Sequence, residues 1–109
     1  MGTAELKQLT DQIVQKLRAH YNPQKIILFG SYADGSAKQD SDLDLLIVKD
    51  TGERFLDRWS TVRRILSDPS RKIALETVVL TPKEVSERLA RGDQFLSQVF
   101  QNGRVLYAS

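Results

Sequence analysis

The sequence predicts an α/β domain, because short apolar runs of β type alternate with longer segments whose apolar residues recur at helical spacing. The three clearest β-type runs are Lys25–Phe29, Asp42–Val48 and Ile73–Leu80. Two of them are separated by about twenty residues of helical pattern, which is typical of strands joined by a helix. The length of 109 residues fits a single domain, 1–109.

The first element is predicted to be a helix with Thr3 as its N-cap, ending near His20 and before Asn22-Pro23. Its apolar side chains recur at three- and four-residue intervals: Leu6, Leu9, Ile13, Val14 and Leu17. His20 is interpreted as structural, because a cation at the end of a helix is favoured by the helix dipole.

A second long helix is predicted between the second and third strands. Its apolar stripe comprises Phe55, Leu56, Trp59, Val62, Ile65 and Leu66. We interpret Trp59 as a core residue of this stripe, with a partner contact as the alternative.

Three elements are predicted after the third strand. Thr81-Pro82 opens a helix whose Val85 and Leu89 face inward, since proline suits the first helical position. A shorter helix, Phe95–Phe100, follows, and the chain is expected to end in a short strand over residues 104–107.

Composition excludes several classes of protein. There are no cysteines, so disulfides and thiolate metal sites are impossible. A net charge of +2 is far from the basic footprint of a dedicated nucleic-acid binder, so nucleic acid is not expected as a direct partner. We see no membrane span or signal-peptide layout and expect a cytoplasmic protein. The basic pairs Arg63-Arg64 and Arg71-Lys72 are interpreted as solvated ends, with a phosphate-attracting patch as the alternative.

The first half of the informative motif is the Gly30-Ser31 pair at the end of the first strand. A glycine there lets a phosphate approach the backbone without a Cβ in the way. Ser31 is expected to cap a short helix, Tyr32–Ala37, whose free N–H groups point toward an anion. Tyr32 is a candidate contact for a nucleotide base or ribose. The pattern therefore indicates a phosphate-binding turn.

The second half is the pair Asp42 and Asp44 at the start of the second strand. Side chains alternate along a strand, so these two carboxylates are expected on the same face. Adjacent carboxylates repel unless a cation lies between them, and oxygen ligands near phosphate select Mg²⁺ or Mn²⁺. The structural alternative is a turn followed by a helix-capping aspartate pair.

The segment GSYADGSAKQDSDLDLLIV resembles the nucleotidyltransferase motif of the DNA polymerase β superfamily, a glycine-serine pair followed by Asp-x-Asp. The short chain resembles the minimal nucleotidyltransferases. This resemblance implies a polymerase β-like α/β fold, with a small mixed sheet and helices packed mainly on one face. It also implies that Gly30 and Ser31 hold a triphosphate and that Asp42 and Asp44 bind metal.

The family has a third acidic residue on a neighbouring strand, and the candidate here is Glu76. Glu76 is the only charged residue within an otherwise apolar run, where an unpaired carboxylate is costly. The alternative is an edge-strand or salt-bridged glutamate. The family normally carries aspartate at this point, and glutamate is one methylene longer, so activity could be intact, weakened or lost.

The resemblance implies an Mg²⁺-dependent enzyme that transfers a nucleoside monophosphate from ATP to a hydroxyl, with two ions held by Asp42, Asp44 and Glu76. It further implies a hetero-oligomer with a helical toxin of the HEPN class, in which adenylylation of a toxin tyrosine makes this chain the antitoxin. Two alternatives stay open. One is transfer to a small, aminoglycoside-like hydroxyl compound with a helper subunit, and the other is a non-catalytic binding module with a degenerate site.

Overall fold

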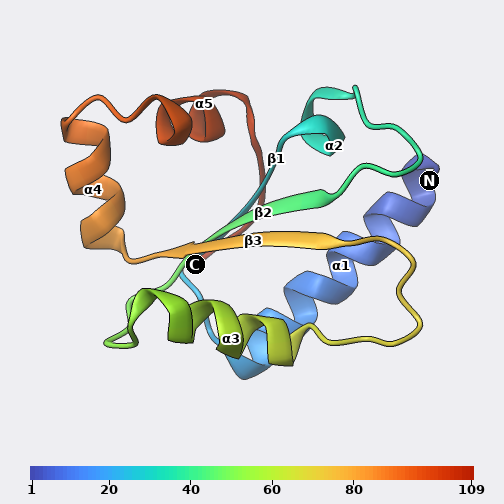
Figure 1. Ribbon diagram of the computed structural model, residues 1–109, viewed down its shortest axis with the longest axis horizontal. Helices are drawn as coiled ribbons and strands as arrows, with labels where there is room; N and C mark the ends of the chain where they lie inside the picture. The colour runs from blue at the N-terminus through green and yellow to red at the C-terminus, as the bar shows by residue number, and fades with distance from the viewer.

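The computed structural model describes residues 1–109 and is built on a four-stranded mixed sheet of order β3-β2-β1-β4 (Figure 1). β1 pairs antiparallel with both β2 and β4, whereas β2 and β3 run parallel. The strands are β1 Lys25–Phe29, β2 Leu43–Val48, β3 Leu75–Leu80 and β4 Arg104–Ala108. The helices are α1 Thr3–His20, α2 Ser31–Asp34, α3 Phe55–Ile65, α4 Pro82–Ala90 and α5 Gln94–Asn102.

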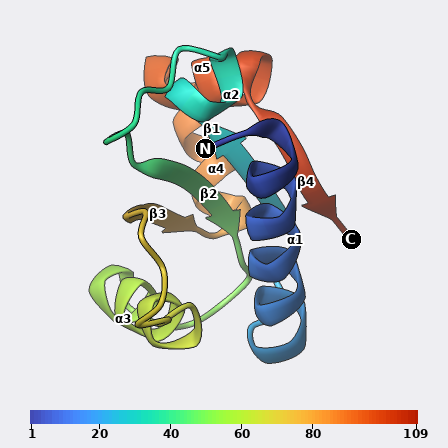
Figure 2. The same ribbon diagram turned by 90° about the vertical axis from the view of Figure 1, so that its right-hand side faces the viewer.

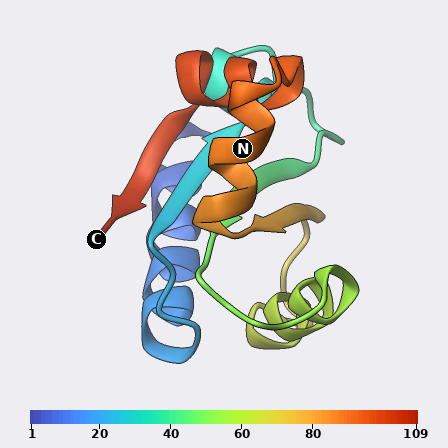
Figure 3. The same cartoon turned by 90° about the vertical axis from the view of Figure 1, so that its left-hand side faces the viewer.

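The predicted fold class is confirmed, and the layering differs from the expectation in one respect. We expected helices mainly on one face, but both faces of the sheet are covered (Figure 1). α1 and α3 pack on one face around Leu17, Leu45 and Val62. α4 and α5 pack on the other face, against Leu46 among others (Figure 3). The reason is that β2 is apolar at successive positions and needs cover on both sides.

Element boundaries shift by a few residues from the prediction. α2 ends at Asp34, before the predicted Ala37, because Gly35 adopts a left-handed conformation (φ +85°) that terminates the helix. Gly30, in place of Ser31, is the N-cap of α2. Gly2, in place of Thr3, is the N-cap of α1.

The second and third strands both begin later than predicted, at Leu43 and Leu75, and Asp42 therefore lies just ahead of β2. The Leu43 N–H donates to the Ala74 carbonyl at 2.9 Å, so the pairing of the two strands starts immediately after Asp42. α1, from the start of the chain, lies beside β4, from its end (Figure 2). The Arg18 guanidinium stacks 4.7 Å from the centre of the Tyr107 ring.

The helix predicted at Thr81-Pro82 is confirmed as α4. The Thr81 side chain accepts from the Glu84 N–H at 3.1 Å, while the Glu84 carboxylate accepts from the Thr81 N–H at 2.8 Å. This reciprocal pair is the capping box that fixes where the helix begins. In α5, Asp93 caps the N-terminus by accepting from the Leu96 N–H at 2.9 Å.

The interpretation of Trp59 as a core residue is wrong, since its side chain is 41% exposed. The cause lies in its neighbour Arg58, which is buried. The Arg58 guanidinium reaches inward to donate to Glu84 Oε1 at 2.6 Å and to the Val79 carbonyl at 3.4 Å. α3 is therefore rotated so that Phe55, Leu56 and Trp59 face outward. Leu89, also expected inside, is 37% exposed on α4.

No helix combines the length and the apolar character needed to cross a membrane.

Candidate active site

Asp44 and Glu76 occupy directly opposed positions on the parallel strands β2 and β3. Opposed residues of neighbouring strands project from the same face of a sheet, so the two carboxylates share one face. That face is the one covered by α4 and α5, because Asp44 alternates in phase with Leu46, which packs in that core. We expected Glu76 to lie beside Asp44 on the neighbouring strand, and the register agrees with this expectation.

Asp42 completes a local concentration of negative charge. Burial, followed by the charges of Glu76 and then Asp42, raises the pKa of Asp44 above its ordinary value. Both other carboxylates are therefore close enough to act electrostatically on Asp44. Asp42 and Glu76 are themselves exposed, whereas Asp44 is half-buried at the end of the core.

Gly30 lies against the Asp44 carboxylate. Phe29 is the strand partner of Asp44, and Gly30 is the next residue. A Cβ added to Gly30 would overlap the Asp44 carboxylate, and Gly30 has φ +74° and ψ −154°, a combination that is essentially restricted to glycine. The glycine was predicted from phosphate approach, but the structure shows a second requirement. It makes room for a carboxylate from the neighbouring strand.

Ser31 and Tyr32 form the first turn of α2, directly after Gly30. Ser31 is half-buried, and no side chain caps the helix. Tyr32 packs against the core on the α1 side of the sheet and lines a cavity with residues of α1, such as Leu9 and Gln12. The structure thus brings Gly30 and Ser31 to the carboxylates and turns Tyr32 toward the opposite face.

Glu76 is exposed, which differs from the setting expected from sequence. A carboxylate inside an apolar strand is costly when it is buried, but β3 is an edge strand and Glu76 is exposed on it. Solvent therefore tolerates its charge, and the weighed alternative of an edge-strand glutamate describes its setting. Its register with Asp44 is what now associates it with the site.

The three carboxylates do not form a preformed metal-binding site. No three acidic or histidine side chains lie close enough together to hold a cation as they stand. Oxygen donors on one face of the sheet nevertheless suit a hard divalent cation. A cation would require Asp42 and Glu76 to rotate toward Asp44, and both side chains are exposed and free to do so.

Comparison with known proteins decides the family. The family model described as "Polymerase beta, Nucleotidyltransferase" matches residues 11–109, almost the whole chain. The chain belongs to the polymerase β nucleotidyltransferase family. The resemblance seen in the Gly30-Ser31 and Asp42-x-Asp44 motif is confirmed at the level of the family.

Two similar proteins of Methanocaldococcus jannaschii are provisionally named as protein adenylyltransferases. MJ1305 is 33% identical over an alignment of 91 residues, and the match covers 79% of this chain and 62% of MJ1305. MJ0604 is 30% identical over 102 residues, which are 94% of each chain. This nucleotidyltransferase-family chain therefore spans less than two thirds of the first relative and nearly all of the second.

The fold also resembles that of a chain in a solved toxin–antitoxin complex. A solved structure of a tri-AMPylated HEPN toxin of Shewanella oneidensis with its MNT antitoxin matches at a TM-score of 0.58 and 20% identity. The match covers 94% of this chain and 72% of the other. At this identity the likeness shows a shared fold.

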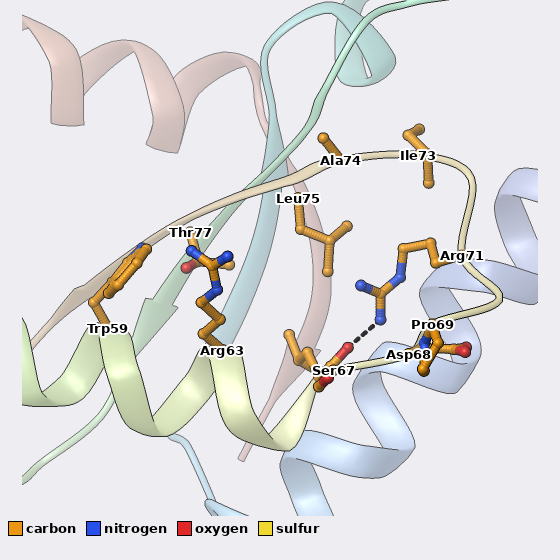
Figure 4. A pocket seen from close by; sticks show the side chains of 11 residues that line it. Trp59, Arg63, Ser67, Asp68, Pro69, Arg71, Ile73, Ala74, Leu75 and Thr77 are labelled. Atoms are coloured by element: carbon orange, nitrogen blue, oxygen red, sulfur yellow. Dashed lines mark hydrogen bonds between the residues drawn. The ribbon is translucent and has the colours of Figure 1, made fainter.

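Besides the cavity lined by Tyr32, two further cavities of this nucleotidyltransferase fold were not foreseen from sequence. The first, of 380 Å³, lies between α3 and β3 and receives the Arg63 and Arg71 side chains, with Trp59 at one end (Figure 4). Arg71 donates to the Leu66 carbonyl, which fixes the loop that forms the cavity floor. This cavity lies on the α3 side of the sheet, whereas Asp44 and Glu76 face α4 and α5.

The second cavity, of 190 Å³, adjoins the carboxylate site between α2 and α5. Its lining includes Phe29 and Gly30 from the site and Phe95, Gln98 and Asn102 from α5. Sequence reasoning missed the α5 residues. These three residues are spaced three and four positions apart, so they lie on one stripe of the helix. The polar residues Gln98 and Asn102 on a stripe with Phe95 were the signal in the sequence that could have pointed to them.

Proposed function

We propose that this chain transfers AMP from ATP to a hydroxyl group of a partner protein. The observation that carries the proposal is the opposition of Asp44 and Glu76 beside the Gly30 turn. Membership of the nucleotidyltransferase family and the names of the two Methanocaldococcus relatives support the reaction class.

Asp42, Asp44 and Glu76 would hold two Mg²⁺ ions, with Mn²⁺ as a substitute, and the Gly30-Ser31 turn would hold the triphosphate. The ions would supply charge stabilisation at the reacting phosphate and a more acidic acceptor hydroxyl. The acceptor oxygen forms a bond to the α-phosphorus while the bond to the pyrophosphate oxygen breaks. The hydroxyl proton passes to a site carboxylate or to solvent, and pyrophosphate leaves.

Glu76 is proposed as the carboxylate nearest the acceptor, because β3 lies at the open edge of the sheet. A residue at the edge can be reached by a large substrate, whereas Asp44 on β2 is flanked by strands on both sides. The additional methylene of glutamate lets an exposed side chain bridge from the edge strand toward Asp44. The longer side chain also holds its carboxylate less precisely, and a misplacement of about 1 Å can cost on the order of a hundredfold in rate.

The acceptor is proposed to be a tyrosine of a HEPN-type helical toxin, which would make this chain a cytoplasmic antitoxin in a hetero-oligomer. The AMPylated toxin in the Shewanella oneidensis complex supports this class of acceptor. The outward-facing α3 residues Leu56 and Trp59 also support a protein partner, since they are 72% and 41% exposed. Trp59 shares a cavity with Thr77, the residue after Glu76, so a partner seated on α3 would lie next to the β3 edge.

A non-catalytic binding module is the second candidate function. It is favoured by one observation, that the three carboxylates do not converge without rotation. Transfer to a small hydroxyl compound, such as an aminoglycoside, is the third candidate function, and it predicts label on that compound in place of a protein.

The test is incubation of the purified chain with α-³²P-ATP, Mg²⁺ and a HEPN-type helical protein from the same genome, followed by gel and mass analysis. We expect label on the helical protein and a mass increase of whole AMP units on tyrosine. Asp44→Asn is the matched control and should abolish labelling. Label on an added aminoglycoside alone would favour the small-molecule alternative. ATP binding without transfer to any acceptor would favour the binding module.

A further inference from the structure

We propose that the 190 Å³ cavity between α2 and α5 binds the base of the donor nucleotide and that Phe95, Gln98 and Asn102 of α5 select an adenine there. This inference rests on the proposed function, because it assigns a place to one part of the ATP molecule. It adds a specificity site on α5, far in sequence from the Gly30-Ser31 and Asp42-x-Asp44 motif.

The cavity lies next to the turn that is proposed to hold the triphosphate. Gly30 lines the cavity and also lies against the Asp44 carboxylate, so the cavity and this carboxylate adjoin the same residue. Phe29, the strand partner of Asp44, forms part of the cavity wall. A nucleotide with its phosphates at the Gly30 turn would therefore have its base within reach of this cavity.

The size of the cavity limits what it can take. Sites for drug-sized molecules have volumes of about 300–1,000 Å³, so 190 Å³ accommodates one ring system and excludes a whole nucleotide. Its walls suit a flat aromatic ring. Phe29 and Phe95 meet edge to face, with ring centroids 5.4 Å apart, and Phe95 is 41% exposed. An exposed aromatic face of this kind is a stacking surface for a base.

The polar residues that line the cavity indicate which base it binds. Gln98 and Asn102 are exposed on one side of α5, four residues apart, and both line the cavity. A side-chain amide offers a donor and an acceptor together, which matches N7 and the 6-amino group of adenine. Across the cavity, Asp34 Oδ1 accepts from the Ser36 N–H and hydroxyl at 2.8 and 2.6 Å, which leaves Oδ2 as a further acceptor.

The charge of the cavity excludes the polyphosphate as its occupant. Asp34 is the only charged residue in the lining, and its negative charge would repel phosphate. Hydrogen bonds from Ser36 lower the pKa of Asp34, so it is ionised at neutral pH. An amino group on a base is attracted by the same carboxylate.

The test is calorimetric titration of the full-length chain with Mg²⁺ and a non-hydrolysable ATP analogue. Phe95→Ala should weaken binding by about 5- to 150-fold, the range for loss of one base-stacking surface, and Phe95→Trp should restore it. The double variant Gln98→Leu, Asn102→Leu should weaken binding by about tenfold or more. Gln101→Leu is the matched control, because Gln101 lies on the same helix and does not line the cavity; it should bind like the wild type.

A second ligand tests the selection of adenine. Purine riboside triphosphate, which lacks the 6-amino group, should bind the wild type about tenfold more weakly than ATP and bind the double variant as well as ATP does. The inference is overturned if the Phe95 and amide variants bind the ATP analogue as tightly as the wild type. It is equally overturned if they keep ATP affinity and raise only the KM for the acceptor, since an acceptor ring would then occupy the cavity. If ATP binds as expected but no AMP is transferred to any acceptor, the proposed function is refuted and this inference is not.

Discussion

Asp44 on β2 and Glu76 on β3 are directly opposed in the parallel register, and a carboxylate therefore projects from each of two neighbouring strands on the same face. Such a pair is unfavourable unless a cation or a proton lies between the two groups. Burial, and then repulsion from Glu76 and Asp42, raises the pKa of Asp44.

Asp44→Asn should abolish nucleotide transfer and leave the fold intact. Because the folded state disfavours the charged form of Asp44, removal of that charge should leave the stability without Mg²⁺ unchanged or slightly higher. Activity is measured by transfer of labelled AMP, and stability by urea unfolding in EDTA. Transfer at the wild-type rate by this variant would refute the proposed mechanism.

Two variants of Glu76 distinguish the effect of its charge from the effect of its side-chain length. Glu76→Gln keeps the length and removes the charge, so transfer should fall by about a hundredfold or more. Glu76→Asp keeps the charge and shortens the side chain by one methylene, so transfer should fall by up to about a hundredfold, less than for Glu76→Gln. The comparison is made by kcat/KM for the protein acceptor. Equal rates for Glu76→Gln and the wild type would remove Glu76 from the site.

Gly30→Ala should disable the site, because the new methyl group overlaps the Asp44 carboxylate. The backbone conformation alone should cost about 1–3 kcal/mol. The matched control is Gly35→Ala, which also has positive φ but would meet no atom within 4 Å. We expect the control to lose some stability and keep transfer, whereas Gly30→Ala loses both. Stability is followed by thermal unfolding. Full activity in Gly30→Ala would contradict the close approach of these residues.

The Arg58–Glu84 pair should make stability depend on acidity. The hydrogen bond from Arg58 is the main cause that holds the pKa of Glu84 below its ordinary value of 4.5. A lowered pKa in the folded state means that the stabilisation is fully present above pH 4.5 and is lost as the pH falls through the folded-state pKa.

Glu84→Gln should therefore destabilise the protein at pH 7 by about 1–2 kcal/mol, a value reduced because the Glu84 side chain is 37% exposed. The difference from the wild type should shrink at pH 3. Urea unfolding at both pH values measures it. Glu87→Gln on the same helix is the control, since Glu87 makes only an exposed 3.9 Å contact with Lys83. An equal loss at both pH values would show that the ion pair is not responsible.

Trp59→Ser should weaken the complex with the helical partner by about tenfold or more, because exposed tryptophans carry large shares of interface energy. The stability of the isolated chain should change little, since the side chain is already 41% exposed. Affinity is measured by calorimetry with the purified partner. Val105→Ser is the control, as Val105 is 60% exposed on β4, at the opposite edge of the sheet. Equal affinity for the Trp59 variant and the wild type would place the partner elsewhere.

The sequence by itself determined the fold class and the local chemistry of the site. The order of helices and strands could be predicted because apolar periodicity and turn residues act over a few neighbouring positions. The Gly30-Ser31 turn and the Asp42-x-Asp44 pair could be identified for the same reason. Their residues lie within one short segment, and the family assignment rested on that segment and is confirmed.

Only the tertiary structure decided which distant residues meet. The placement of Glu76 opposite Asp44 depends on the register of two strands joined by α3, which no local pattern specifies. The outward position of Trp59 depends on Arg58 reaching Glu84, 26 residues away. The cavity beside Gly30 depends on α5 packing across the end of β1. In each case the free energy comes from contacts between segments far apart in the chain, which local preferences do not contain.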